Sequence, residues 1–203
     1  TPPITVEARV TLPSRSNYNI IVASDTKQSG AHWELFSMNG SGNLTVYTPG
    51  LKPDHTNSKA MICDGKPHNV GMTYESDLIR LFVDGQVVAS QNVESAGRGT
   101  VPGGLAIGKL VEGGIGSSGL PEWVRISKGV RASLWKMGHV PPKDDSTLLA
   151  WARPQHSHAD HHAASHGGNS APMGKVPEYS AEVVSQLLAD AREHGNAARG
   201  IMV

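Results

Sequence analysis

The residues best suited to metal chemistry form a histidine-rich stretch late in the chain. It contains His156, His158, His161, His162 and His166, with Asp160 among them. Neutral imidazole nitrogens bind zinc, copper and nickel, so these side chains are candidate metal ligands. Their spacing is irregular and their surroundings look like a linker, which argues against a preformed catalytic site. Loose metal binding by His156, His158, His161 and His162 and a solvated linker without metal both stay open.

The aromatic side chains are the groups most able to stack on a sugar ring or to anchor a protein partner. They are Trp33, Trp123, Trp135 and Trp151, with Tyr18, Tyr47 and Tyr74. We expect Trp33, Tyr47 and Trp123 to bind ligand, with packing in the core as the alternative for each. Binding residues tend to lie on loops, so loops 24–31, 95–104 and 112–119 are expected to form a binding rim.

No nucleophile or phosphate-binding loop stands out. Cys63 is the only cysteine, which excludes a disulfide within the chain and a four-cysteine zinc site. We expect it to be a small buried side chain rather than an activated thiolate. The chain has no Gly-x-Ser-x-Gly motif, and neither glycine-rich loop ends in the Lys-Ser/Thr of a phosphate cradle.

Charge and hydropathy limit the classes of partner. The chain has 18 basic and 18 acidic residues, so it has no global attraction for nucleic acid or an anionic membrane. No apolar run approaches the roughly 18 to 20 residues of a membrane helix. The first residues, Thr1-Pro2-Pro3, lack an initiating Met and a signal-like segment. We therefore expect a processed protein or an excised fragment, with no membrane span in this portion.

Alternation of apolar and polar residues predicts an all-β domain. The clearest strand is 4–12, where Ile4, Val6, Ala8 and Val10 alternate with polar residues, which indicates one buried face. Residues 64–85 predict an antiparallel meander that ends in the tight turn Asp84-Gly85. Segment 49–62 is polar and contains prolines, so we expect a long connection or an irregular edge. Further strands are expected at 18–23, 32–38, 44–48, 86–90, 105–108, 123–127 and 147–151. Together they predict a two-sheet antiparallel sandwich.

After this domain the composition changes. Residues 153–177 are rich in His, Ala, Ser and Gly and have almost no large aliphatic side chain, so a linker is expected. Residues 178–203 predict a helical segment. Ser180 can cap it, and Val183, Val184, Leu187 and Leu188 form an apolar stripe.

Several motifs in the first part of the chain resemble the laminin-G-like group of concanavalin A-like jelly rolls, in its bacterial form. The resemblance covers about residues 4–135 and implies a jelly-roll domain over residues 1–152. It rests on Asp64-Gly65-Lys66, His68, Val70, Thr73-Tyr74, Leu81-Phe82-Val83-Asp84-Gly85, Leu105, Ile107-Gly108 and Val124-Arg125-Ile126.

The resemblance raises the question of calcium. Members of this group commonly have Ile-Asp-Glu before the Val-Arg-Ile strand, and the acidic residue there can join a calcium site. This chain has Pro121-Glu122-Trp123 instead. Calcium needs about six to eight oxygen ligands, and Glu122 alone does not predict such a cluster. A calcium ion at Glu122 is kept as the alternative to a chain without a cofactor.

The resemblance also allows a test for catalytic carboxylates in residues 75–80. Glycanases of this fold carry carboxylates as Glu-x-Asp-x-x-Glu, which supplies an acid and a nucleophile together. Glu75-Ser76-Asp77 begins that pattern, but the residue three positions beyond Asp77 is Arg80. We therefore expect a polar turn here and no enzyme activity.

The end of the chain resembles the first helix of small c-type cytochrome domains. The similar residues are Gly195-Asn196-Ala197-Ala198-Arg199-Gly200. In that family haem-attachment cysteines follow soon after, so haem is expected only if a C-x-x-C-H motif follows Val203.

The leading hypothesis is a non-catalytic recognition or docking module of an exported protein, periplasmic or extracellular, that binds a glycan or a protein surface. The alternative is a structural subunit of an extracytoplasmic electron-transfer complex. In that case the jelly roll would pack on neighbouring subunits of a membrane-associated redox complex, and the C-terminal part would connect to a c-type cytochrome.

Overall fold

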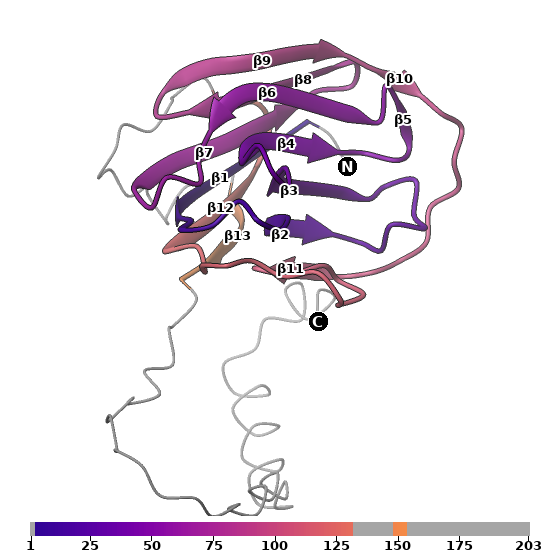
Figure 1. Cartoon of the computed structure of the whole chain (residues 1–203). Helices are drawn as coiled ribbons and strands as arrows, with labels where there is room; N and C mark the ends of the chain where they lie inside the picture. The colour runs from indigo at the N-terminus through magenta and orange to yellow at the C-terminus, as the bar shows by residue number, and fades with distance from the viewer. Residues whose placement is uncertain (1–2, 132–147, 154–203) are drawn as a thin grey trace, which may run out of the picture. The chain divides into compact units, whose positions relative to one another are not determined.

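The computed structural model describes residues 3–131 and 148–153. The described residues contain strands and no helix, and two antiparallel sheets lie face to face (Figure 1). This is the expected two-sheet sandwich. No helix among the described residues is long and apolar enough to cross a membrane. The linker, the helical segment and the cytochrome-like end were predicted at 153–203, which apart from Arg153 lies outside the described residues.

The first sheet has six strands in the order β13-β12-β1-β7-β8-β9. Their bounds are Ile4–Thr11 (β1), Pro67–Tyr74 (β7), Leu78–Val83 (β8), Gln86–Asn92 (β9), Trp123–Lys128 (β12) and Leu148–Ala152 (β13). The strand predicted at 147–151 is present as β13, which pairs with β12.

The second sheet has five strands in the order β11-β2-β3-β4-β6. Their bounds are Asn19–Ser24 (β2), Trp33–Ser37 (β3), Asn43–Tyr47 (β4), His55–Met61 (β6) and Leu105–Ile107 (β11). Two short strands, Leu51–Lys52 (β5) and Glu94–Ser95 (β10), pair with each other.

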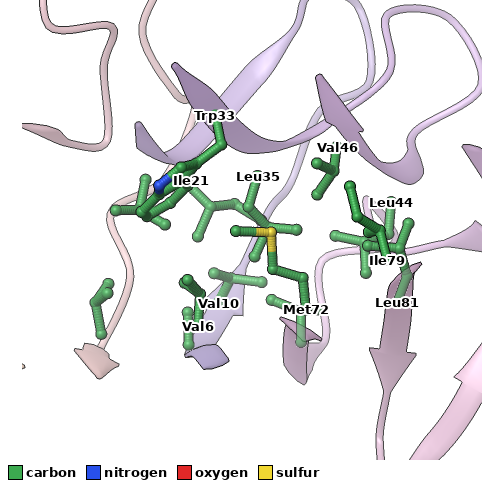
Figure 2. Close-up of a cluster of buried hydrophobic side chains, with 14 of the residues drawn as sticks. Val6, Val10, Ile21, Trp33, Leu35, Leu44, Val46, Met72, Ile79 and Leu81 are labelled. Carbon is green, nitrogen blue, oxygen red and sulfur yellow. The ribbon is translucent and has the colours of Figure 1, made fainter. Parts of the chain in front are cut away.

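The core fills the space between the two sheets. Alternate residues of each strand point into it, as the pleat of a strand requires. Figure 2 shows this cluster: Val6, Val10, Met72, Ile79 and Leu81 from the six-stranded sheet meet Ile21, Trp33, Leu35, Leu44 and Val46 from the five-stranded sheet. The apolar alternation of the sequence therefore identified the inward face of most strands.

The meander predicted at 64–85 contains β7 and β8, and its last turn leads into β9, where a strand was predicted at 86–90. Asp84 and Gly85, which connect β8 to β9, have φ angles of 49° and 83°. Two successive positive φ angles are typical of a tight hairpin turn, and they explain why Asp-Gly stands there.

His68 connects the turn that precedes β7 to the turn between β8 and β9. Its Nδ1 atom lies 2.7 Å from Oδ2 of Asp84, and its Nε2 atom lies 3.0 Å from Oδ1 of Asp64. The other Asp84 oxygen accepts a bond from the backbone N–H of Asn69 at 2.8 Å. Asp64, His68 and Asp84-Gly85, on which the family resemblance rests, are therefore part of the scaffold.

One expectation about the strands was confirmed in part and one was wrong. Segment 49–62 was expected to be a long connection or an irregular edge; it contains β5 and β6, and β6 is an edge strand of the five-stranded sheet whose pairing with β4 shifts register. The inward positions of β6 include Thr56 and Ser58, which are small, buried and polar, so no apolar alternation marks this strand. Strand β1 is buried on both faces: Glu7 is buried too, with its Oε2 atom 3.7 Å from Nη1 of Arg125 and 3.5 Å from Nε of Arg131.

Candidate functional site

An open groove lies on the outer face of the five-stranded sheet, on the side away from the core. Its volume is about 290 Å³. We call it the aromatic groove, and it is lined by Tyr18, Ile20, Lys27, Glu34, Phe36, Tyr47, Asp54, His55 and Ile115. Rings and charged groups therefore meet in one open hollow, as in many small-molecule sites.

The middle of the groove is a row of three side chains from neighbouring strands. Glu34 on β3 is paired directly with Tyr47 on β4, which is paired directly with His55 on β6. Directly opposed residues of a sheet point to the same face, so the register alone brings these three together. The rings of Tyr47 and His55 are in contact, with centroids 4.6 Å apart, and Nδ1 of His55 hydrogen-bonds to Oδ1 of Asp54 at 2.8 Å.

A buried carboxylate forms part of the groove floor. Glu34 is only 3% exposed. Its Oε1 atom lies 3.4 Å from Nζ of Lys27, and its Oε2 atom lies 3.5 Å from Nε2 of His32. The ring of His32 is oriented from the other side, because Nδ1–H donates to the backbone carbonyl of Asp25 at 3.0 Å. The ammonium group of Lys27 offsets part of the desolvation cost of the carboxylate, and the imidazole of His32 faces its second oxygen.

Glu34 also has capacity to accept further hydrogen bonds. Among the described residues, its Oε2 atom has no hydrogen-bond partner of good geometry. A carboxylate oxygen can accept more than one bond, and a buried acceptor without one costs about 1–3 kcal/mol. Nζ of Lys27 lies 3.4 Å from Oε1 of Glu34 and 5.7 Å from the centroid of the Tyr47 ring. A hydroxyl group in the groove would therefore meet the Oε1 atom and the ammonium group together, whereas the Oε2 atom is covered.

One wall of the groove is a small hairpin that packs on the sheet. Lys109 and Gly116 form a β-bridge, and the N–H of Leu110 donates to the carbonyl of Ile115 at 3.0 Å. Leu110 is buried against Ile20 and Phe36 in a second apolar cluster, which Ile115 joins. The wall is thus anchored by apolar contacts rather than left as a free loop.

The structure places the three predicted ligand-binding residues differently. Tyr47 lies in the aromatic groove, in the middle of the row described above. Trp33 is 7% exposed and lies among the core side chains (Figure 2), and Trp123 is 1% exposed. Neither indole lines the aromatic groove. Trp33 belongs to the core cluster, whereas Trp123 is buried opposite Arg9 on the other face of the six-stranded sheet.

The predicted rim loops divide between two hollows. Loop 24–31 supplies Lys27 to the aromatic groove, and loop 112–119 supplies Ile115. Loop 95–104 instead lines a separate rim cavity of about 490 Å³, together with Asp25. Arg98 and Thr100 belong to that cavity.

Sequence reasoning missed Lys27, Glu34, Phe36 and His55 as groove residues. A signal was present for two of them: Glu34 and Phe36 alternate with the core residues Trp33 and Leu35, so they must point outward. No comparable signal existed for His55, because its strand was not recognised.

The candidate calcium ligand Glu122 forms an ion pair with Arg9. Nε of Arg9 donates to Oε2 of Glu122 at 3.0 Å, so the carboxylate is already paired with a cation. Within residues 3–131 and 148–153, no group of three or more His, Cys, Asp or Glu side chains could hold a metal ion. The candidate ligands His156, His158, His161 and His162 lie outside the described residues.

The carboxylates at 75–77 lie in the turn between β7 and β8. The N–H of Glu75 donates to the carbonyl of Leu78 at 2.9 Å, which closes the expected turn. The side chain of Glu75 forms an ion pair with Arg80. An arginine thus stands beside Glu75 where the glycanase pattern requires a second acid.

Cys63 is buried, as expected. Its thiol donates to Oγ of Ser37 at 3.2 Å. Burial raises the pKa of Cys63 above its usual value, and this outweighs the lowering by hydrogen bonds from Ser37 and Asn19. The thiol is therefore less easily ionised than an exposed one.

Solved structures with a similar fold include a proposed carbohydrate-binding protein from Bacteroides ovatus, at 18% identity and a TM-score of 0.54. The match covers 81% of this chain and 47% of that protein, so this chain spans about half of its length. A heptameric SAP-like pentraxin from Limulus polyphemus matches at 14% identity with a TM-score of 0.49, over 74% of this chain and 79% of the pentraxin. No curated protein matches. The sequence profile of a laminin G family matches residues 1–135, and the chain therefore belongs to the concanavalin A-like lectin/glucanases superfamily.

Proposed function

We propose that this chain is a non-catalytic binding module whose aromatic groove holds a glycan. The observation that carries the proposal is the row Glu34, Tyr47 and His55, with Lys27 beside it. A sugar has apolar C–H faces and a rim of hydroxyl groups. The Tyr47 ring can pack on such a face, while the carboxylate and the ammonium group can accept and donate bonds to hydroxyls.

The carboxylates of the groove favour binding over hydrolysis. A glycosidase needs one carboxyl group as an acid and a second as a base or nucleophile. Here Glu34 lies between Lys27 and His32, and Asp54 is hydrogen-bonded to His55. Each carboxylate thus already has a basic side chain as its partner, which favours a role in orienting a ligand.

The fold also supports a glycan-binding module. The Bacteroides ovatus protein that shares this fold is itself a proposed carbohydrate-binding protein, and the superfamily takes its description from lectins and glucanases. Of these two classes, the paired carboxylates make the lectin class the better fit.

A glycan array tests the proposal with the full chain and two variants. Tyr47→Ala removes the central ring and should weaken binding about tenfold or more, because ring contacts contribute of the order of 1 kcal/mol beyond the area that they bury. Val87→Ala is the control, since Val87 is 54% exposed on β9 and outside the groove. Equal binding by Tyr47→Ala and the control would refute the groove as the glycan site.

Two other results would redirect the proposal. Binding of a protein and of no glycan would favour the docking form of the module. Release of reducing sugar from a bound glycan would indicate an enzyme, and loss of that release on changing Glu75 or Asp77 would restore the glucanase reading.

The cellular setting is a separate proposal. An exported module, periplasmic or extracellular, would have access to glycans outside the cytoplasm, and cell fractionation tests this. The alternative role in an electron-transfer complex rests on residues 195–203, which lie outside the described residues, and it stays a prediction. A C-x-x-C-H motif after Val203 is its first requirement.

A further inference from the structure

A second hollow adjoins the aromatic groove. Its volume is about 530 Å³. Tyr18 and Ile115 line both hollows, so the two are neighbours that share these side chains. We call the second hollow the polar extension.

The polar extension has a different chemistry from the groove. Ser14, Ser16 and Asn17 line one side, and Ser117 and Ser118 line the other. Hydroxyl and amide groups both donate and accept hydrogen bonds. None of the described residues that line this hollow has a charged side chain. The extension therefore suits a ligand portion that is rich in hydroxyl groups and carries no charge.

A buried asparagine holds the two sides of the extension in place. Asn19, on β2, is 1% exposed. Its Nδ2 atom donates to the carbonyl of Ser14 at 2.8 Å, and its Oδ1 atom accepts from the N–H of Ser118 at 2.7 Å. The N–H of the next residue, Ile20, donates to the carbonyl of Gly116 at 3.4 Å. The extension is thus built by bonds between segments far apart in sequence, and its shape is set before a ligand arrives.

Tyr18 marks the junction of the two hollows. Its side chain is 39% exposed, and its ring packs against Phe36 with centroids 5.9 Å apart. An aromatic ring that is supported on one side and open on the other can receive the face of a sugar. The two adjoining hollows therefore offer one exposed ring, Tyr18, and one half-buried ring, Tyr47.

We propose that the ligand is an oligosaccharide that lies across both hollows, with an uncharged segment in the polar extension. This inference rests on the proposed function and adds the length and the charge of the ligand to it. One sugar unit packs on Tyr47 beside the Lys27–Glu34 ion pair, and the following units pass Tyr18 into the extension. A monosaccharide would contact only part of this path.

The test uses two oligosaccharide ladders of increasing length on one array, neutral hexose oligomers and uronic acid oligomers. Affinity for the neutral ladder should rise by about tenfold or more from the monosaccharide to the longest member, because each added unit makes new hydrogen bonds. Affinity for the uronic acid ladder should rise less from the monosaccharide to the longest member. The double variant Asn17→Ala/Ser118→Ala should reduce this gain with length several-fold.

The double variant keeps the bonds that build the extension. Ser118 is attached through its backbone N–H and Asn17 through its backbone carbonyl, so alanine at either position leaves these contacts in place. Ser90→Ala/Asn92→Ala is the matched control, since both residues are exposed on β9. The control should show the full gain with length.

The outcomes separate the two proposals. Glycan binding that is equal for all lengths, or a full gain with length in the double variant, would overturn this inference and leave the proposed function standing. A larger rise in affinity with length on the uronic acid ladder would contradict the claim that the ligand segment in the polar extension is uncharged. If Tyr47→Ala binds all array members as the wild type does, the groove itself is excluded and this inference falls with it.

Discussion

The ammonium nitrogen Nζ of Lys27 lies 3.4 Å from Oε1 of Glu34 at the floor of the aromatic groove. Lys27 comes from a loop and Glu34 from the middle of a sheet, so the fold brings together two charges that the sequence separates by a turn. The pair matters for function because both groups line the groove. It is held further by His32 on the second carboxylate oxygen.

The first prediction concerns this pair. Lys27→Met and Glu34→Gln should each weaken glycan binding about tenfold, because each removes a charged partner for ligand hydroxyls. The double variant should lose less than the sum of the two losses, since the residues interact directly. Titration calorimetry measures the affinities, and Lys128→Met, at an exposed position of β12, is the control. Full additivity would contradict a coupled pair.

The second prediction concerns the scaffold. His68→Ala removes the side chain that joins Asp84 and Asp64, and it should lower the free energy of unfolding by about 1–3 kcal/mol. Urea unfolding followed by circular dichroism measures this. His55→Ala is a suitable comparison, because the His55 side chain is more exposed and joins no second turn. A smaller effect at His68 than at His55 would show that the turns are held together by other contacts.

The third prediction concerns acid stability. The backbone N–H of Lys66 donates to Asp64, and with His68 nearby this holds the pKa of Asp64 below its usual value. A carboxyl group with a lowered pKa in the folded state stabilises the fold above its unfolded pKa of about 4, and this contribution is lost as the pH falls through the folded pKa. Asp64→Asn should therefore flatten the stability profile below about pH 4. An unchanged profile would exclude Asp64 as a contributor.

The fourth prediction concerns Cys63. Burial raises the pKa of Cys63, so the folded protein should react slowly with a thiol reagent, and urea should speed the reaction strongly. The raised pKa also means that the unfolded chain ionises first as the pH rises above about 8.5, which lowers stability at alkaline pH. Cys63→Ala should reduce that alkaline loss. Fast labelling of the native protein would contradict the buried thiol.

Much of the fold could be predicted from local patterns. The alternation around Val6 and Val10 gave a central strand, and Asp84-Gly85 gave a hairpin whose φ angles are those that such a turn needs. Strand β6 could not be predicted in this way, because Thr56 and Ser58 occupy its inward positions and are polar. The burial of Glu7 was also invisible, since its partners Arg125 and Arg131 are more than a hundred residues away.

The site could be predicted only in part. Tyr47 was identified by its residue type, but type alone favoured Trp33 and Trp123 equally, and both are buried. What distinguishes the three is the surroundings of each: Trp33 points into the core, Trp123 is covered on the outer face of the six-stranded sheet, and Tyr47 lines the aromatic groove. The row Glu34, Tyr47 and His55 follows from the register of three strands, and register depends on pairings that no single segment of sequence specifies.

The most direct test of the account is to locate bound glycan on the protein by NMR. The isotope-labelled full chain would be titrated with the oligosaccharide that binds best on the array. We predict that the largest shifts of backbone amide signals occur at Lys27, Glu34, Tyr47 and His55. The assignment of the glycan site to the aromatic groove would be contradicted if these signals stayed in place while those of the rim cavity, such as Arg98 and Thr100, moved.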